Sequence, residues 1–347
     1  MIVVCIALIF LFAYLFLTKD TKKRKRYFVI SSGIVLFLYA ALRGVLPGTD
    51  MMGYIRKYEL YATYSPEQIF NIFSSDVKDP VFHVLGWCLS SIGFTHAQWW
   101  IAFIAGIYLV PAMVIIYKES PQPLTSSIMF LALGFFSFSL TGLRQTLAMG
   151  FIFLSYFYLR DKKLIKFIIL VLVASLFHST ALIFLIAYPL ARRKFGVIHI
   201  LLFVVTVVAV VLFEGQIRTL IFVTLEDSYL GGYATKETGL NLTGFLIQGV
   251  LFLIALSYYS KTLKTYSQSI AIYNLAFLGL IFQFSAVMIA EMFRISMYFS
   301  FFNIILFPMA ISTEKSWKIR FLEIAGSIML FIIYFLRNGI PEYFFFW

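Results

Sequence analysis

The chain has 347 residues, of which 61% are hydrophobic and only 13% charged, and its mean hydropathy is +0.92. These values exclude a soluble globular protein and indicate an integral membrane protein. The formal net charge is +12, but the basic residues stand beside apolar segments, where membrane topology explains them, so we expect no nucleic-acid partner.

Apolar runs of about 17 to 22 residues recur along the chain, which is the length of a membrane-spanning helix and not of a barrel strand. The composition therefore predicts an all-α, polytopic helical bundle of about ten full spans, forming one transmembrane domain over residues 1–347. Residues 81–94 are expected to lie on the outer face or to dip into the membrane without crossing it. The predicted spans are 1–17, 27–46, 97–117, 124–142, 143–159, 197–213, 243–259, 268–290, 295–312 and 321–337.

Charge counting supports this topology, because the inner loops collect most of the Lys and Arg and the outer segments most of the Asp and Glu. Both termini are then external. Two long external loops, residues 47–80 and 214–243, are rich in Tyr, Asp, Glu and Ser or Gly and suit substrate capture or a lid.

A membrane hairpin is predicted over residues 164–190. Basic clusters flank this apolar stretch on both sides, so the positive-inside rule places both ends in the cytoplasm. Each arm, 164–177 and 179–190, is shorter than the ~20 residues that span the hydrocarbon, so the chain must turn back within the bilayer. His178 stands at the tip of this hairpin, as a general base, a proton donor or a structural hydrogen-bond partner.

Three arginines occupy the predicted outward ends of helices: Arg43, Arg144 and Arg294. Arginine within a span is costly, so such residues usually face a cavity or a partner, although snorkelling to lipid headgroups is the alternative. Guanidinium groups bind phosphate oxygens in a bidentate manner, which makes the set a candidate lipid-pyrophosphate site. Arg144 and Gln145 follow a tight turn and begin a helix, where free backbone N–H groups reinforce anion binding.

Further candidates surround these arginines. Asp50 follows a Pro-Gly-Thr turn, where it is either a base or sugar-binding group or a helix N-cap. Glu291 stands one helical turn before Arg294, with a simple ion pair as the alternative. Several tyrosines are candidate sugar-stacking platforms, although interfacial tyrosines are common: Tyr54, Tyr229, Tyr233 and Tyr298.

Metal and cofactor signals are weak in this sequence. Cys5 and Cys88 lie in apolar segments and support neither a disulfide framework nor a metal site. His83, His96 and His199 are interpreted as interfacial. Because no His, Asp or Glu constellation has ligand spacing, we expect no bound metal and no cofactor.

Five short motifs in register also resemble a known family over nearly the whole chain. They are Arg43-Gly44-x-x-x-Gly48-Thr49-Asp50-x-x-x-Tyr54, Asp79-Pro80-x-Phe82, Arg144-Gln145-x-x-Ala148, Lys162-Lys163 with Ala174-x-x-x-His178-Ser179, and Arg294-x-x-x-Tyr298. This pattern resembles the EpsG-like branch of Wzy polysaccharide polymerases. The second long loop is less typical, and its Glu226 and Tyr233 align only loosely.

The resemblance implies a GT-C-like fold and a metal-independent glycosyltransferase. Its substrates would be undecaprenyl-pyrophosphate-linked oligosaccharide repeats, polymerised at the outer, periplasmic face of a bacterial inner membrane into O-antigen (lipopolysaccharide), capsule or exopolysaccharide. Membrane lipid, a chain-length regulator and a flippase are the expected partners. The predicted reaction is an inverting transfer, with Arg144, Arg294 and Arg43 stabilising the pyrophosphate and either His178 or Asp50 as the base.

Three other functions remain open from the sequence. A GT-C-like transferase that uses a lipid-monophosphate sugar is the nearest alternative. A lipid-linked oligosaccharide flippase or transporter belongs to a different class and should carry mid-membrane charges along a pathway open to both sides. An O-acyltransferase is a weaker third alternative.

Overall fold

The computed structural model describes residues 21–44, 50–75, 77–225 and 242–338. All regular elements in these residues are helices, which confirms the all-α class for the described part of the chain. The first half contains α2 (Thr21–Ala41), α3 (Asp50–Tyr61), α4 (Pro66–Phe70), the 3-10 helix η1 (Asn71–Ser74), α5 (Pro80–Ser91), α6 (Ala97–Glu119), α7 (Pro123–Ala132), α8 (Phe135–Ser139) and α9 (Leu143–Arg160). The second half contains α10 (Leu164–Ser175), the 3-10 helix η2 (Ser179–Ile186), α11 (Ala187–Leu190), α12 (Val197–Leu225), α13 (Thr243–Ser257), α14 (Tyr259–Thr265), α15 (Ser269–Met288), α16 (Met292–Ser300), α17 (Asn303–Ile311) and α18 (Trp317–Asn338).

Among the described residues, four helices are long and apolar enough to cross a membrane: Ala97–Glu119, Val197–Ile217, Ser269–Met288 and Trp317–Leu336. Two bent pairs, α13 with α14 and α16 with α17, raise this number to six if each pair is one span. The predicted span 1–17 lies outside the described residues. The total of about ten spans therefore stays a prediction.

Two predicted spans are interrupted in the structure: 124–142, and 295–312, which is bent by 41° between α16 and α17. Residues 124–142 do not form a single helix, because α7 ends at Ala132 and the short α8 follows after a break. Gly134 lies at this break with a φ of +79°, a left-handed conformation that glycine adopts without the steric cost that a side chain would add. The apolar composition of the segment gave no sign of this interruption.

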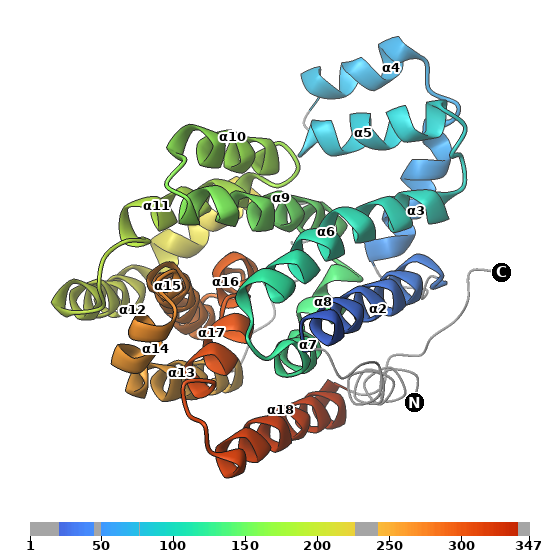
Figure 1. The fold of residues 1–347 in the computed structure, drawn as a ribbon. Helices are drawn as coiled ribbons and strands as arrows, with labels where there is room; N and C mark the ends of the chain where they lie inside the picture. Colours follow the sequence, from blue (N-terminus) through green and yellow to red (C-terminus); the bar gives the residue numbers. More distant parts are fainter. Residues whose placement is uncertain (1–20, 45–49, 76, 226–241, 339–347) are drawn as a thin grey trace.

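The segment predicted as the first external loop contains helices, and its position outside the membrane stays a prediction. Residues 50–75 are mostly helical and form α3, α4 and η1, while α12 extends through the start of the predicted second loop to Leu225. In α4, Ser65 and Gln68 form a capping box, in which each side chain accepts a hydrogen bond from the backbone N–H of the other residue. Figure 1 shows α3, α4 and α5 gathered at one corner of the molecule.

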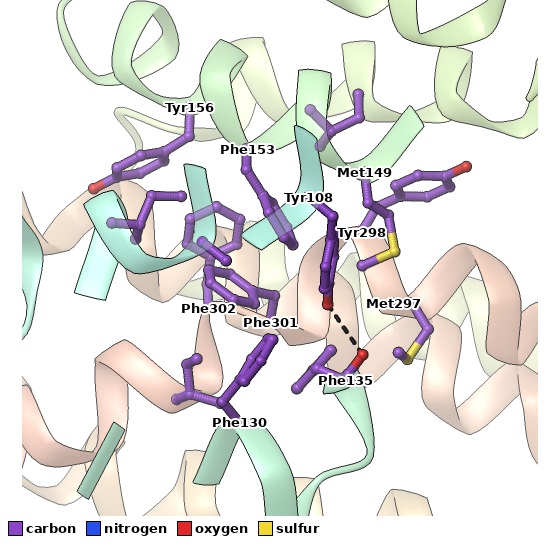
Figure 2. Close-up of a cluster of buried hydrophobic side chains, with 14 of the residues drawn as sticks. Tyr108, Phe130, Phe135, Met149, Phe153, Tyr156, Met297, Tyr298, Phe301 and Phe302 are labelled. Atoms are coloured by element: carbon purple, nitrogen blue, oxygen red, sulfur yellow. Dashed lines mark hydrogen bonds between the residues drawn. The ribbon is translucent and has the colours of Figure 1, made fainter. Parts of the chain in front are cut away.

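The centre of the bundle is aromatic (Figure 2). Tyr108 of α6 donates a hydrogen bond to the Phe135 carbonyl at 3.1 Å, and Phe153 of α9 stacks on Phe301 with ring centroids 4.1 Å apart. Lipid is as apolar as these side chains, so helix association in a membrane depends on close packing and hydrogen bonds.

Two glycines permit the closest helix contacts. A Cβ added at Gly150 of α9 would lie 2.3 Å from the Ile107 carbonyl oxygen of α6, and one at Gly279 of α15 would lie 2.7 Å from the Ser300 nitrogen of α16. Since both obstacles are backbone atoms, a larger residue would force the helices apart. These positions set the spacing of the helix pairs α6 with α9 and α15 with α16.

Helix α9 separates two polar regions. At its C-terminal end Arg160 pairs with Glu119 at 2.5 Å and with Asp161 at 2.8 Å. Lys25 donates a hydrogen bond to the carbonyl of Ser120, the residue that follows Glu119. The hydrogen bond and charge of Arg160 lower the pKa of Asp161. Arg144 lies at the other end of this 18-residue helix, about 25 Å away along its axis.

Candidate active site

Arg144 takes its position from the turn that begins α9. The chain leaves α8, and Gly142 packs so closely that an added Cβ would lie 3.0 Å from the Phe138 ring. The Thr146 N–H then donates to the Gly142 carbonyl at 2.8 Å, which starts the helix. Arg144 therefore stands in the first helical turn, as the sequence predicts, where the helix dipole favours anions.

Arg144 is already engaged by a carboxylate that the sequence analysis did not select. Its Nη1 lies 3.0 Å from Oδ2 of Asp79, and its Nε lies 3.4 Å from the hydroxyl of Tyr54. The Arg144 and Asp79 side chains are only 13% and 10% exposed. A pair that is so little exposed interacts more strongly than a surface ion pair.

Asp79 owes its orientation to an unusual backbone. It precedes Pro80, the first residue of α5, and has a left-handed φ of 51° and ψ of 53°. Aspartate tolerates this conformation better than most residues. The Asp79 side chain makes no capping hydrogen bond to α5, so it is turned to the long-range contacts with the other helices.

His178 lies on the other side of the same carboxylate. Its Nδ1 is 3.5 Å from Oδ2 of Asp79, the oxygen that Arg144 contacts, and its side chain is 10% exposed. Nδ1 and Nε2 are both buried, and neither ring nitrogen makes a hydrogen bond within the described residues. The Asp79 carboxylate is near enough to attract a protonated imidazole, and both ring nitrogens lack a hydrogen-bond partner in this part of the chain.

The backbone around His178 follows the predicted turn between two short arms. Helix α10 ends at Ser175, His178 is extended with φ −159° and ψ 111°, and η2 begins at Ser179. The His178 N–H donates to the Ala174 carbonyl and its carbonyl accepts from Ala181, so both backbone groups are satisfied at the break. The placement of this hairpin within a bilayer remains a prediction.

Helix α16 brings Arg294 to the cluster. Gln145 donates through Nε2 to the Arg294 carbonyl at 2.5 Å, and the Gln145 Oε1 is buried without a partner in the described part of the chain. The charge of Arg294 acts on the His178 imidazole together with the charges of Asp79 and Arg144. Arg144 and His178 therefore contact the Asp79 carboxylate directly, while Arg294 acts on His178 through its charge alone.

The alternative interpretation of Glu291, a simple ion pair with Arg294, is not supported in the described residues, and its substrate-binding role stays a prediction. Within the described residues no ion pair joins their side chains, and Glu291 Oε2 is buried without a hydrogen-bond partner. Glu291 precedes α16 and accepts the Arg294 N–H through its backbone carbonyl. Glu291 is therefore at the N-terminus of α16, the helix that carries Arg294.

Tyr298 has a different environment from the one that sugar stacking requires. It is completely buried in α16, and its hydroxyl lies 3.1 Å from Thr180 Oγ1, at the start of η2 (Figure 2 shows its ring in the core). Its ring offers no face to a sugar in this structure. Tyr298 instead joins α16 to the segment that carries His178.

The remaining candidates are only partly placed. Arg43 is buried, its Nη2 lies 3.7 Å from the Met51 sulfur, and its carbonyl accepts from Gln98 at 3.1 Å. Asp50 begins α3, but its side chain lies outside the described set. Glu226, Tyr229 and Tyr233 also lie outside the described residues.

No group of three or more His, Cys, Asp or Glu side chains that could hold a metal ion occurs within residues 21–44, 50–75, 77–225 and 242–338. The charged groups of the cluster are instead two arginines, one aspartate and one histidine. Such a set can bind an anion and move a proton at one place.

Comparison with known proteins adds a family assignment to this geometry. A family model described as the EpsG family matches residues 26–346. No significant match was found among curated proteins or among solved structures. The family match includes all four residues of the cluster.

Proposed function

The chain belongs to the EpsG family, and from this premise we propose a specific reaction for the cluster around Asp79. Membership indicates a glycosyltransferase-type enzyme with a polymerase role in exopolysaccharide synthesis at a membrane. The proposed reaction transfers a growing glycan from undecaprenyl pyrophosphate to an incoming undecaprenyl-pyrophosphate-linked oligosaccharide repeat. O-antigen and capsule synthesis would use the same chemistry.

The proposed step is a single displacement with inversion. An acceptor hydroxyl oxygen attacks the anomeric carbon of the donor sugar, a C–O bond forms, and the bond from that carbon to the pyrophosphate oxygen breaks. The lipid pyrophosphate leaves with the bonding electron pair, and the hydroxyl proton passes to His178 Nε2. Because pyrophosphate is already a good leaving group, this scheme routes no step through a metal ion.

The single observation that supports this proposal is the contact of the Asp79 carboxylate with both Arg144 and His178. One carboxylate oxygen lies 3.0 Å from Arg144 and 3.5 Å from His178. In the proposed reaction it orients the imidazole and stabilises the imidazolium that forms as the proton arrives. This contact favours His178 over Asp50 as the base, a choice that the sequence left open.

Arg144 and Arg294 take the charge of the leaving group. Developing negative charge on the pyrophosphate is best stabilised by preorganised cations in a site with little water. The Gln145 hydrogen bond to the Arg294 carbonyl at 2.5 Å holds the two helices in register, so Gln145 is a positioning residue in this scheme. Holding two lipid-anchored substrates side by side would lower the barrier further.

An outward-facing site is also part of the proposal. The basic loop that includes Lys162, Lys163 and Lys166 lies next to the end of α9 opposite Arg144, and positive loops mark the cytoplasmic side. The cluster would then face the periplasm or exterior of the inner membrane. A flippase that delivers the repeats and a chain-length regulator are the proposed partners.

Purified protein in detergent, supplied with lipid-pyrophosphate-linked repeats, tests the function. We expect a ladder of products that differ by one repeat, with one lipid pyrophosphate released for each bond formed. A transferase that uses a lipid-monophosphate sugar would extend its acceptor only when given that donor. A flippase forms no glycosidic bond, so it would leave the substrate unextended. Unextended substrate would therefore contradict the proposal.

A further inference from the structure

A pocket lies between α3, the α4–η1 segment and α5, in the part of the chain that also contains Asp79. Its volume is about 490 Å³, within the range of about 300 to 1,000 Å³ that is usual for small-molecule sites. The lining combines aromatic rings with hydrogen-bonding side chains, which include Tyr61, Tyr64, Gln68 and His83. Such a lining suits a ligand that has both C–H faces and hydroxyl groups.

The floor of this pocket contains a buried, hydrogen-bonded pair of side chains. The hydroxyl of Tyr61 lies 2.5 Å from Nδ1 of His83, and both residues are at most 5% exposed. Burial raises the pKa of Tyr61, so its hydroxyl keeps its proton, and the hydrogen bond to His83 forms with either the hydroxyl or Nδ1–H as the donor. Gly86 allows this packing, since a Cβ there would lie 2.8 Å from the Tyr61 ring.

The rim carries accessible donors and an aromatic ring. Tyr64 is partly exposed, and its carbonyl accepts a hydrogen bond from Trp87 Nε1 at 3.1 Å, which fixes the end of α3 on α5. Gln68 uses Oε1 in the capping box, so its side-chain NH₂ remains to donate. Lys57, on the exposed face of α3, adds an ammonium group.

One short segment of chain borders both the pocket and the cluster. Val77 and His83 line the pocket, while Asp79, between them in sequence, contacts Arg144 and His178. Phe82 also packs edge-on against Tyr54, whose hydroxyl is 3.4 Å from Arg144. A ligand in the pocket therefore lies next to the residues that we assign to the reaction.

We propose that this pocket is a glycan subsite, which holds a sugar ring of the polymer or repeat one or a few residues away from the reacting bond. The ring would stack on Tyr64, and its hydroxyls would bond to Lys57, Gln68 and the buried Tyr61–His83 pair. This inference rests on the proposed function, because it needs a glycan substrate at Asp79. It assigns recognition of the sugar chain to α3–α5 and leaves the transfer chemistry to the cluster.

The direct test measures binding of short oligosaccharides, cut from the host cell's own surface polysaccharide, to the purified full-length protein. We expect saturable binding by the wild type, about tenfold weaker binding by Tyr64→Ala, and weaker binding by Lys57→Ala. Phe73→Ala is the matched control, because Phe73 is an exposed aromatic of the same segment that does not line the pocket. This variant should bind like the wild type.

Two outcomes would overturn the subsite: no oligosaccharide binding by the wild type, or equal binding by the wild type and Tyr64→Ala. A polymerisation assay on the same preparations separates this failure from that of the function. If the wild type makes a product ladder but Tyr64→Ala binds normally, the subsite is wrong and the polymerase function stands. If the wild type binds oligosaccharide in a Tyr64-dependent manner but forms no new bond, the pocket is a glycan-binding site and the polymerase function is wrong.

Discussion

Replacing Asp79 with asparagine tests the cluster most sharply, because the change keeps the shape of the side chain and removes its charge. At an effective dielectric constant of about 20, the gross attraction of Asp79 for Arg144 at 3.0 Å is about 5.5 kcal/mol. The attraction for a protonated His178 at 3.5 Å is about 4.7 kcal/mol. Desolvation offsets part of both interactions.

The second interaction exists only when His178 gains its proton, so it acts mainly on the transition state. A net loss of about 3 kcal/mol there corresponds to a rate about 150-fold lower, within the range of about 10² to 10⁴ for general base catalysis. The assay is the initial rate of polymer formation by purified Asp79→Asn protein, with thermal unfolding measured on the same sample to separate activity from folding.

Asp161→Asn is the matched control, at the end of α9, the helix that carries Arg144. Asp161 follows α9 and pairs with Arg160 at 2.8 Å, but its side chain is 39% exposed and it lies at the end opposite Arg144. This variant should polymerise within about twofold of the wild type, since exposed ion pairs contribute only about 0 to 1 kcal/mol. Wild-type polymerisation by Asp79→Asn would refute the assigned role of Asp79.

Three further predictions concern the anion site, the packing and the sidedness. Arg144→Ala should abolish polymer while single-repeat glycans remain, and Arg144→Lys should restore little activity because an ammonium cannot bind phosphate in a bidentate manner; a normal chain-length distribution for Arg144→Ala would exclude its role. Gly150→Leu should lower the unfolding temperature in detergent, since the Ile107 carbonyl blocks even a Cβ, and overpacking costs about 1 to 3 kcal/mol or more; an unchanged temperature would contradict the close α6–α9 contact. In a chain without its native cysteines, Arg56→Cys should react with an impermeant maleimide from outside intact cells, and Lys163→Cys only after permeabilisation; the opposite pattern would invert the proposed topology.

The sequence predicted features that depend on local composition. The apolar run at 97–117 is α6, residues 268–290 contain α15, and the break predicted at His178 coincides with the end of α10 and the start of η2. Arg144 stands in the first turn of its helix, because the Thr-Gly turn before it interrupts a long apolar stretch. These signals lie within one or two helical turns of the residues concerned.

The features that the sequence did not predict depend on tertiary contacts. Asp79 was part of a motif, and the Asp-Pro pair marked a helix start, but nothing local indicated that its carboxylate would reach Arg144 and His178. Tyr298 is a sugar-stacking candidate from the sequence because tyrosines favour interfaces, whereas packing against η2 buries it completely. Residues 50–75 contain no long apolar run, so the sequence predicts a segment outside the membrane but not the helices α3, α4 and η1 that form there.

The most direct test of the proposed active site is the rate of glycan transfer by purified His178→Ala protein, compared with His96→Ala. His96 caps the N-terminus of α6 and is exposed, so its loss should change the transfer rate by no more than about twofold. We expect His178→Ala to transfer at least about 100-fold more slowly while remaining folded. Transfer at the wild-type rate by folded His178→Ala protein would contradict the assignment of His178 as the base.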